Sequence, residues 1–218
     1  MTKHFDDELN ELKQRLLYSS SLVERMIQLS VKALVERKIE VADDVLKQEE
    51  EVNKLQVEID DRCLKLIALY QPAASDLRII TSTMKINAEL ERMGDQAVNI
   101  VDAGKEILKY PVLKKLVDIP YVADIVKGMV KESLYSFVKK DAGLAQKVLE
   151  KDSKVDDIKD QIFRELLTYM LSDSKNIKVA LELILVSRHL ERIADHATNI
   201  AEDVIFIVSG KDVRHQLK

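Results

Sequence analysis

Apolar residues recur at spacings of three, four and seven along most of the chain, and this spacing is typical of one buried face of an α-helix. In the first half it predicts helices over residues 6–35, 40–69 and 75–108. Pro72 ends the second of these because proline cannot continue the hydrogen-bond ladder of a helix. We expect Ser75 or Asp76 to cap the third.

The second half shows the same periodic pattern. It predicts one helix over residues 118–140, with Pro120 in its first turn, and another that begins after a cap at Asp141 and ends near Leu171. A last helix is expected to end at Gly210, a residue type common just after helix ends. Between the halves, residues 109–120 contain two of the three prolines.

An internal repeat relates the two halves. The segment Leu90–Ile100 aligns without gaps with Leu190–Ile200, and seven of the eleven positions are identical. Upstream, Val52 aligns with Val155 and Ile59 with Ile162, at an offset of 103 instead of 100, so the length difference falls in a helix connection. The sequence therefore predicts an all-α fold of two tandem, duplicated three-helix bundles, over residues 1–110 and 111–218.

Composition and charge narrow the function. The chain has only 5 glycines and 3 prolines, which suits long helices, and its formal charge of −4 argues against a nucleic-acid binder. We expect a cytoplasmic protein without membrane insertion, because the start has no apolar signal core and no long apolar run follows. The single cysteine, Cys63, is expected to be an ordinary packed thiol.

Acidic residues follow the repeat. Each half has a Glu-x-x-x-Asp-x-x-x-Asn series, and on a helix its members form one nearly axial row away from the apolar stripe. The rows are Glu91, Asp95 and Asn99 in the first half, and Glu191, Asp195 and Asn199 in the second.

A second acidic pair lies on the preceding helix of each half. Asp152 and Asp156 form it in the second half, and Glu49 and Asn53 are the aligned residues of the first. Carboxylates that converge from neighbouring helices are a common way to bind Fe, Mn or Mg ions in a helical bundle. Acids four residues apart also occur on solvated faces, where Arg92 and Arg192 could pair with them, so both readings stay open.

Catalytic motifs are absent from the sequence. His189 and His196 flank the second acidic row, but Glu89 and Gln96 stand in the first copy, so we expect surface or boundary histidines, with accessory metal ligation as the alternative. No Glu-x-x-His motif, nucleophile arrangement or phosphate-binding glycine loop is present. We therefore expect no enzyme.

The duplicated unit, with Glu-Arg-[Met/Ile]-[Gly/Ala]-Asp-x-Ala-x-Asn-Ile late in each half, resembles the PhoU family of phosphate-specific transport system accessory proteins over essentially the whole chain. The resemblance implies a cytoplasmic homodimer that negatively regulates phosphate uptake and the phosphate-starvation response. Its implied partners are the nucleotide-binding subunit of the phosphate ABC transporter and a phosphate-sensing histidine kinase. These partners would also give it a peripheral position at the inner face of the membrane.

The resemblance also implies multinuclear metal clusters, with iron as the first expectation and zinc, manganese or magnesium as alternatives. The implied ligands are Glu49, Glu91, Asp95, Asp152, Asp156, Glu191 and Asp195, with Asn53, Asn99 and Asn199 as accessory groups. Asn53 departs from the family pattern, and because an amide is a weaker ligand than a carboxylate we expect a weaker first-half site. A metal-binding or iron-storage protein without a phosphate role, and a purely structural scaffold, are the alternatives.

Overall fold

The computed structural model describes residues 3–38 and 40–210, and this part of the chain is almost entirely helical. The predicted bundle bounds 1–110 and 111–218 also include residues 1–2, 39 and 211–218, which lie outside the described residues. The helices are α1 (Lys3–Glu36), α2 (Glu40–Tyr70), α3 (Ser75–Ile107), α4 (Asp118–Lys139), α5 (Ala142–Ser172) and α6 (Ile177–Ser209), with a 3₁₀ turn at Ser174–Asn176. The predicted all-α, duplicated fold is confirmed.

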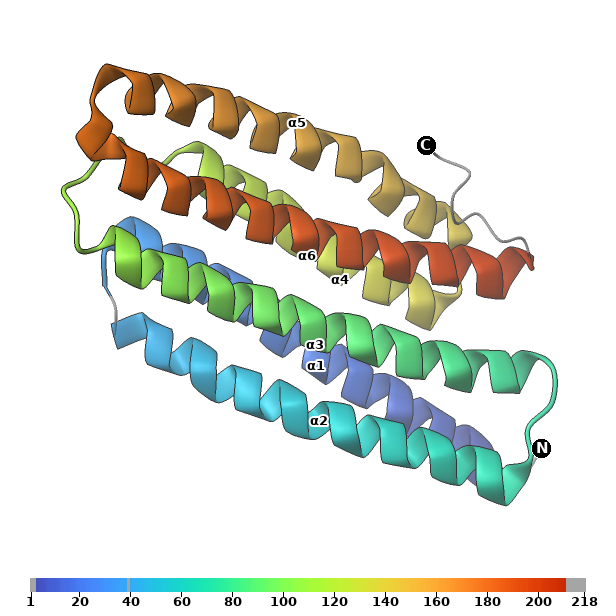
Figure 1. Ribbon diagram of the computed structural model, residues 1–218. Coiled ribbons are helices and arrows are strands. Elements are labelled where there is room, and N and C mark those ends of the chain that lie inside the picture. Colours follow the sequence, from blue (N-terminus) through green and yellow to red (C-terminus); the bar gives the residue numbers. More distant parts are fainter. Residues whose placement is uncertain (1–2, 39, 211–218) are drawn as a thin grey trace.

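The helices of each half form a three-helix bundle, and the two bundles lie side by side (Figure 1). Helix α3 packs against α6 in antiparallel orientation, and α1 packs against α4. Helices α2 and α5 contact only their own halves, so they are the outermost helices. No helix in the described part of the chain is apolar enough over a sufficient length to cross a membrane.

The apolar stripes of the repeated motif lie in the core. Leu90, Met93 and Ala97 on α3 are fully buried, and so are their equivalents on α6. One continuous apolar cluster runs through all six described helices, so the halves share a core instead of meeting across a solvated gap. This close packing of one half on the other follows from the apolar residues on more than one face of α3 and α6.

The helix ends match the sequence prediction except at α3. The side chain of Asp141 accepts a hydrogen bond from the Leu144 amide and caps α5, and Gly210 closes α6 in the left-handed conformation. The prediction that Ser75 or Asp76 caps α3 is wrong. Both lie inside the first turn, and Ala74 occupies the cap position. Its side chain cannot accept hydrogen bonds from the free N–H groups of the first turn.

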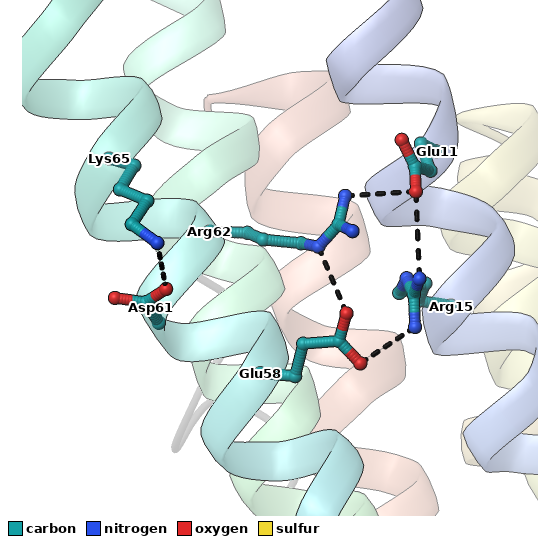
Figure 2. Close-up of polar contacts among 6 residues, drawn as sticks. All are labelled: Glu11, Arg15, Glu58, Asp61, Arg62 and Lys65. Carbon is teal, nitrogen blue, oxygen red and sulfur yellow. Dashed lines mark hydrogen bonds and ion pairs between the residues drawn. The ribbon is translucent and has the colours of Figure 1, made fainter.

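A network of ion pairs joins α1 to α2 on the surface of the first half (Figure 2). Arg15 donates to Glu58 at 2.7 Å, and Arg62 lies 2.9 Å from Glu11 and 3.2 Å from Glu58. Each helix thus contributes one arginine and one glutamate, and each arginine pairs with a glutamate of the other helix. A network of this kind holds its side chains in place better than an isolated surface pair. It fixes the outermost helix α2 along α1.

Candidate functional site

The acidic rows of the repeated motif lie on the outer side of α3 and α6. Glu91 and Glu191 are half-buried, whereas Asp95 and Asp195, one turn further along, are more exposed and only partly covered by their neighbours. The buried stripe of each helix turns these residues away from the core and towards the outermost helix of the same half.

In the second half, α5 and α6 bring four carboxylates together. Burial, followed by the negative charges of Asp195 and Asp156, raises the pKa of Asp152 to about 6. Burial and the charge of Glu191 likewise raise the pKa of Asp195. Like charges have this effect only at short range, so these side chains of α5 and α6 lie near one another. We call Asp152, Asp156, Glu191 and Asp195 the second carboxylate group.

A lysine that the sequence analysis missed lies within this group. The ammonium of Lys159 is 2.8 Å from Oδ1 of Asp156 and 3.2 Å from Oε1 of Glu191, so it bridges α5 and α6. The hydrogen bond to Asp156 raises the pKa of this ammonium group against the opposing effect of burial. The sequence could have identified Lys159, because it lies three residues after Asp156 and therefore on the same face of the helix.

In the first half, α2 and α3 form the corresponding group of Glu49, Glu91 and Asp95. Burial, and then the charge of Asp95, raises the pKa of Glu91, and Glu49 contributes in the same direction. The Asn53 amide donates a hydrogen bond to Glu49 on its own helix. We call Glu49, Glu91 and Asp95 the first carboxylate group.

The donor set of both groups is made of carboxylate oxygens, which suit hard and borderline cations. In the second group an ammonium ion already lies between two of these carboxylates, which indicates that a positive charge is accommodated there. Among the described residues, and with the side-chain conformations of the structure, no three His, Cys, Asp or Glu residues lie close enough together to hold a metal ion. Binding would therefore require these side chains to change rotamer.

The histidines lie instead in the seam between the halves. Nδ1 of His189 is 2.8 Å from Oε1 of Gln96, and Nδ1 of His196 is 2.6 Å from Oε2 of Glu89. Because positions 89 and 189, and 96 and 196, are equivalent in the repeat, the two contacts are related by a pseudo-two-fold axis. The repeat itself could have predicted these pairs, had antiparallel packing of the two motif helices been assumed.

The asparagines of the acidic rows have different surroundings. The Asn199 amide donates to Oε2 of Glu89 at 3.1 Å, across the seam between the halves. Asn99 is exposed and lines a shallow surface pocket with Asp102 and His189.

The pKa of His189, which lines the same pocket, is lowered by burial and then by the charges of Arg192 and Arg188.

Comparisons with known proteins agree over most of the chain. A family model described as "PhoU domain" matches residues 19–103 and again residues 119–204. A protein of Aquifex aeolicus named "Phosphate-specific transport system accessory protein PhoU homolog" is 45% identical over 209 residues, covering 96% of this chain and 95% of its own.

Two solved structures share the fold. The crystal structure of PhoU from Pseudomonas aeruginosa has a TM-score of 0.91 and 36% sequence identity, covering 95% of this chain and 100% of its own. The crystal structure of the phosphate transport system regulatory protein PhoU from Streptococcus pneumoniae has a TM-score of 0.87 and 28% identity, covering 96% of this chain and 99% of its own.

Proposed function

The chain belongs to the PhoU family, and we propose that it is a negative regulator of phosphate uptake and of phosphate-starvation signalling. The observation that supports this most directly is the high identity, over nearly the full length of both chains, to a relative named as a phosphate-specific transport system accessory protein. The duplicated motif on α3 and α6 adds support, because both copies match the family model.

In this proposal the protein works as an adaptor without catalysis. Its partners are the nucleotide-binding subunit of the phosphate ABC transporter and a phosphate-sensing histidine kinase, and it acts in the cytoplasm as a homodimer beside the inner face of the membrane. The six long helices of the described residues pack around one continuous core, which supports the idea because a shared core gives a stiff body on which outward-facing residues keep a fixed arrangement.

We further propose that the two carboxylate groups bind metal ions, with iron first and zinc, manganese or magnesium as alternatives. The residues that would hold the ions are those of the first and second carboxylate groups. The pKa values of Asp152 and Glu91 are raised by burial first and then by repulsion from neighbouring acids, and this repulsion, which a bound cation would relieve, supports the proposal. When bound, the cation would supply charge neutralisation that draws α5 to α6, and α2 to α3.

A reporter of a phosphate-starvation gene in the source organism tests the regulatory role. With ample phosphate, deletion of this gene should raise the reporter and complementation should return it to the wild-type level. A reporter that stays low after deletion, in a strain without any second gene of the family, would contradict the proposal.

Metal analysis of the purified protein tests the second part. Asp95→Ala should lower the metal content of the first group, and Asp195→Ala that of the second. Asp61→Ala is a matched control, because Asp61 is an exposed aspartate of α2 that pairs only locally with Lys65. Bound iron that turns over, with no response in the reporter, would favour an iron-storage protein instead.

A further inference from the structure

The two carboxylate groups differ in charge at two aligned positions. Where the second half has Asp156 and Lys159, the offset of 103 places Asn53 and Gln56 in the first half. The second half thus has one additional carboxylate and one additional cation, whereas the first half has two neutral amides. Each group keeps the same formal charge of −3, from three carboxylates in the first half and from four with one lysine in the second.

The geometry shows why the two differences belong together. Lys159 is 28% exposed at its side chain, and its two short contacts are with Asp156 on α5 and Glu191 on α6, whereas Asp160 on α5 is more distant at 3.9 Å. The ammonium therefore neutralises the additional carboxylate and also ties α5 to α6. In the first half, the Asn53 amide bonds to Glu49 on α2 itself, so this position does not tie α2 to α3. The two helices are joined instead by the neutral amide of Asn87 on α3, which donates to Asp60 on α2.

We propose that Lys159 is a built-in counter-ion of the second carboxylate group, which holds α5 to α6 in the metal-free protein and competes with a metal ion for Asp156 and Glu191. A metal ion bound by Asp156 and Glu191 would use the carboxylate oxygens that the ammonium group of Lys159 contacts. The metal ion can therefore bind there only after the side chain of Lys159 moves away. The competition rests on the metal binding proposed above, whereas the bridging role does not.

This role reverses the order of affinity that the carboxylate count suggests. Counting ligands, the first group appears weaker because Asn53 replaces an aspartate. With Lys159 in place, however, the second group has to give up a bridge before it binds, whereas the first group has no ammonium to displace. The first group is then the one that fills at the lower metal concentration, and the second responds only when metal is more abundant.

A binding titration with Mn²⁺ alone tests the competition on the metal-free, full-length protein. The second group is isolated in a Glu91→Gln/Asp95→Asn background, and the affinity is compared with and without Lys159→Gln. We expect Lys159→Gln to tighten Mn²⁺ binding about fivefold to tenfold, the effect of removing one partly screened positive charge a few ångströms away. Lys147→Gln, which removes an exposed lysine of the same helix, is the charge-matched control and should leave the affinity unchanged.

The reciprocal change tests the same idea in the first group. In a Glu191→Gln/Asp195→Asn background, Gln56→Lys should weaken Mn²⁺ binding by a similar factor. If Mn²⁺ binds in both backgrounds but neither substitution at these aligned positions alters its affinity, the competition is overturned and the proposed metal binding stands. If Mn²⁺ binds to neither the wild type nor any variant, the metal binding itself fails and the competition fails with it.

A metal-free measurement tests the bridging role independently of any metal. In the presence of a chelator at low ionic strength, Lys159→Gln should lower the melting temperature by about 2–4 °C, because the four acids then face one another without a cation. Lys159→Arg keeps the charge and should restore most of that loss. A Lys159→Gln protein that is as stable as Lys147→Gln would overturn the bridging role.

Discussion

At the seam between the halves, the carboxylate of Glu89 accepts hydrogen bonds from two side chains of the other half. Burial acts to raise the pKa of this carboxyl, but the bonds from His196 and Asn199 outweigh it and bring the pKa below its ordinary value. An acid with a lowered pKa in the folded state stabilises the fold above its unfolded pKa, and this stabilisation is lost as the pH falls through the folded pKa.

Glu89→Gln should therefore reduce stability at neutral pH and matter less in acid. We expect its melting temperature to be about 3 °C lower than that of the wild type near pH 7, with the difference shrinking below about pH 4. Glu50→Gln, at an exposed position of α2, should differ little from the wild type at any pH. Thermal scans across this pH range measure both, and a constant difference for Glu89→Gln would contradict the assignment.

Cys63 shows a second consequence of burial for a single residue. Its side chain is 0% exposed, and burial, with a smaller contribution from the charge of Asp60, raises the pKa of the thiol to about 12. Because the thiolate is the reactive form, a thiol reagent at about pH 8 should react very slowly with the native protein and with one thiol per chain after denaturation. Rapid labelling of the native protein would show that α2 opens readily.

At the scale of the helices, α4 and α1 each end at a non-glycine residue with a positive φ angle. Lys140 closes α4 and Arg37 follows α1, and both have positive φ, at 53° and 55°. Lys140→Gly should stabilise the fold by about 1 kcal/mol, because glycine adopts this conformation without strain. Arg37→Gly should destabilise it instead, because the guanidinium donates to the carbonyls of Leu108 and Tyr110 after α3. Denaturant unfolding gives both signs, and equal effects would contradict this reading.

Helix positions were largely predictable from the sequence, because the apolar periodicity and the punctuation at Pro72, Asp141 and Gly210 agree locally. The repeat also put Asp156 and Glu191 on neighbouring helices, and Lys159 lies between them, but the metal binding inferred from this spacing stays a prediction. The capping of α3 was not predictable, because Ala74 carries no cap signal. Nor was the partner of Lys159, because helix periodicity fixes a face but not which residue of the neighbouring helix lies opposite.

At the scale of the whole molecule, the repeat suggests two independent bundles, but the packing makes one body. Helix α3 lies against α6 and α1 against α4, and the apolar core is continuous across both seams. If one half unfolded, the other would expose these faces to water, and this exposure costs a free energy of about 25 cal/mol for every Å² of apolar surface. We therefore expect the two halves to unfold together in a single transition.

The aligned core residues Ile59 and Ile162 test this cooperativity with one substitution in each half, since both are buried to 2% exposure or less. Ile59→Ala and Ile162→Ala should each lower the one melting temperature by about 6–12 °C, as a large-to-small change in a packed core costs about 2–5 kcal/mol. In scanning calorimetry the calorimetric and van't Hoff enthalpies should stay equal in the wild type and in both variants. If Ile59→Ala instead split the transition and moved only its first part, the halves would be separate folding units, and a signal at one carboxylate group could not be passed to the other through the shared core.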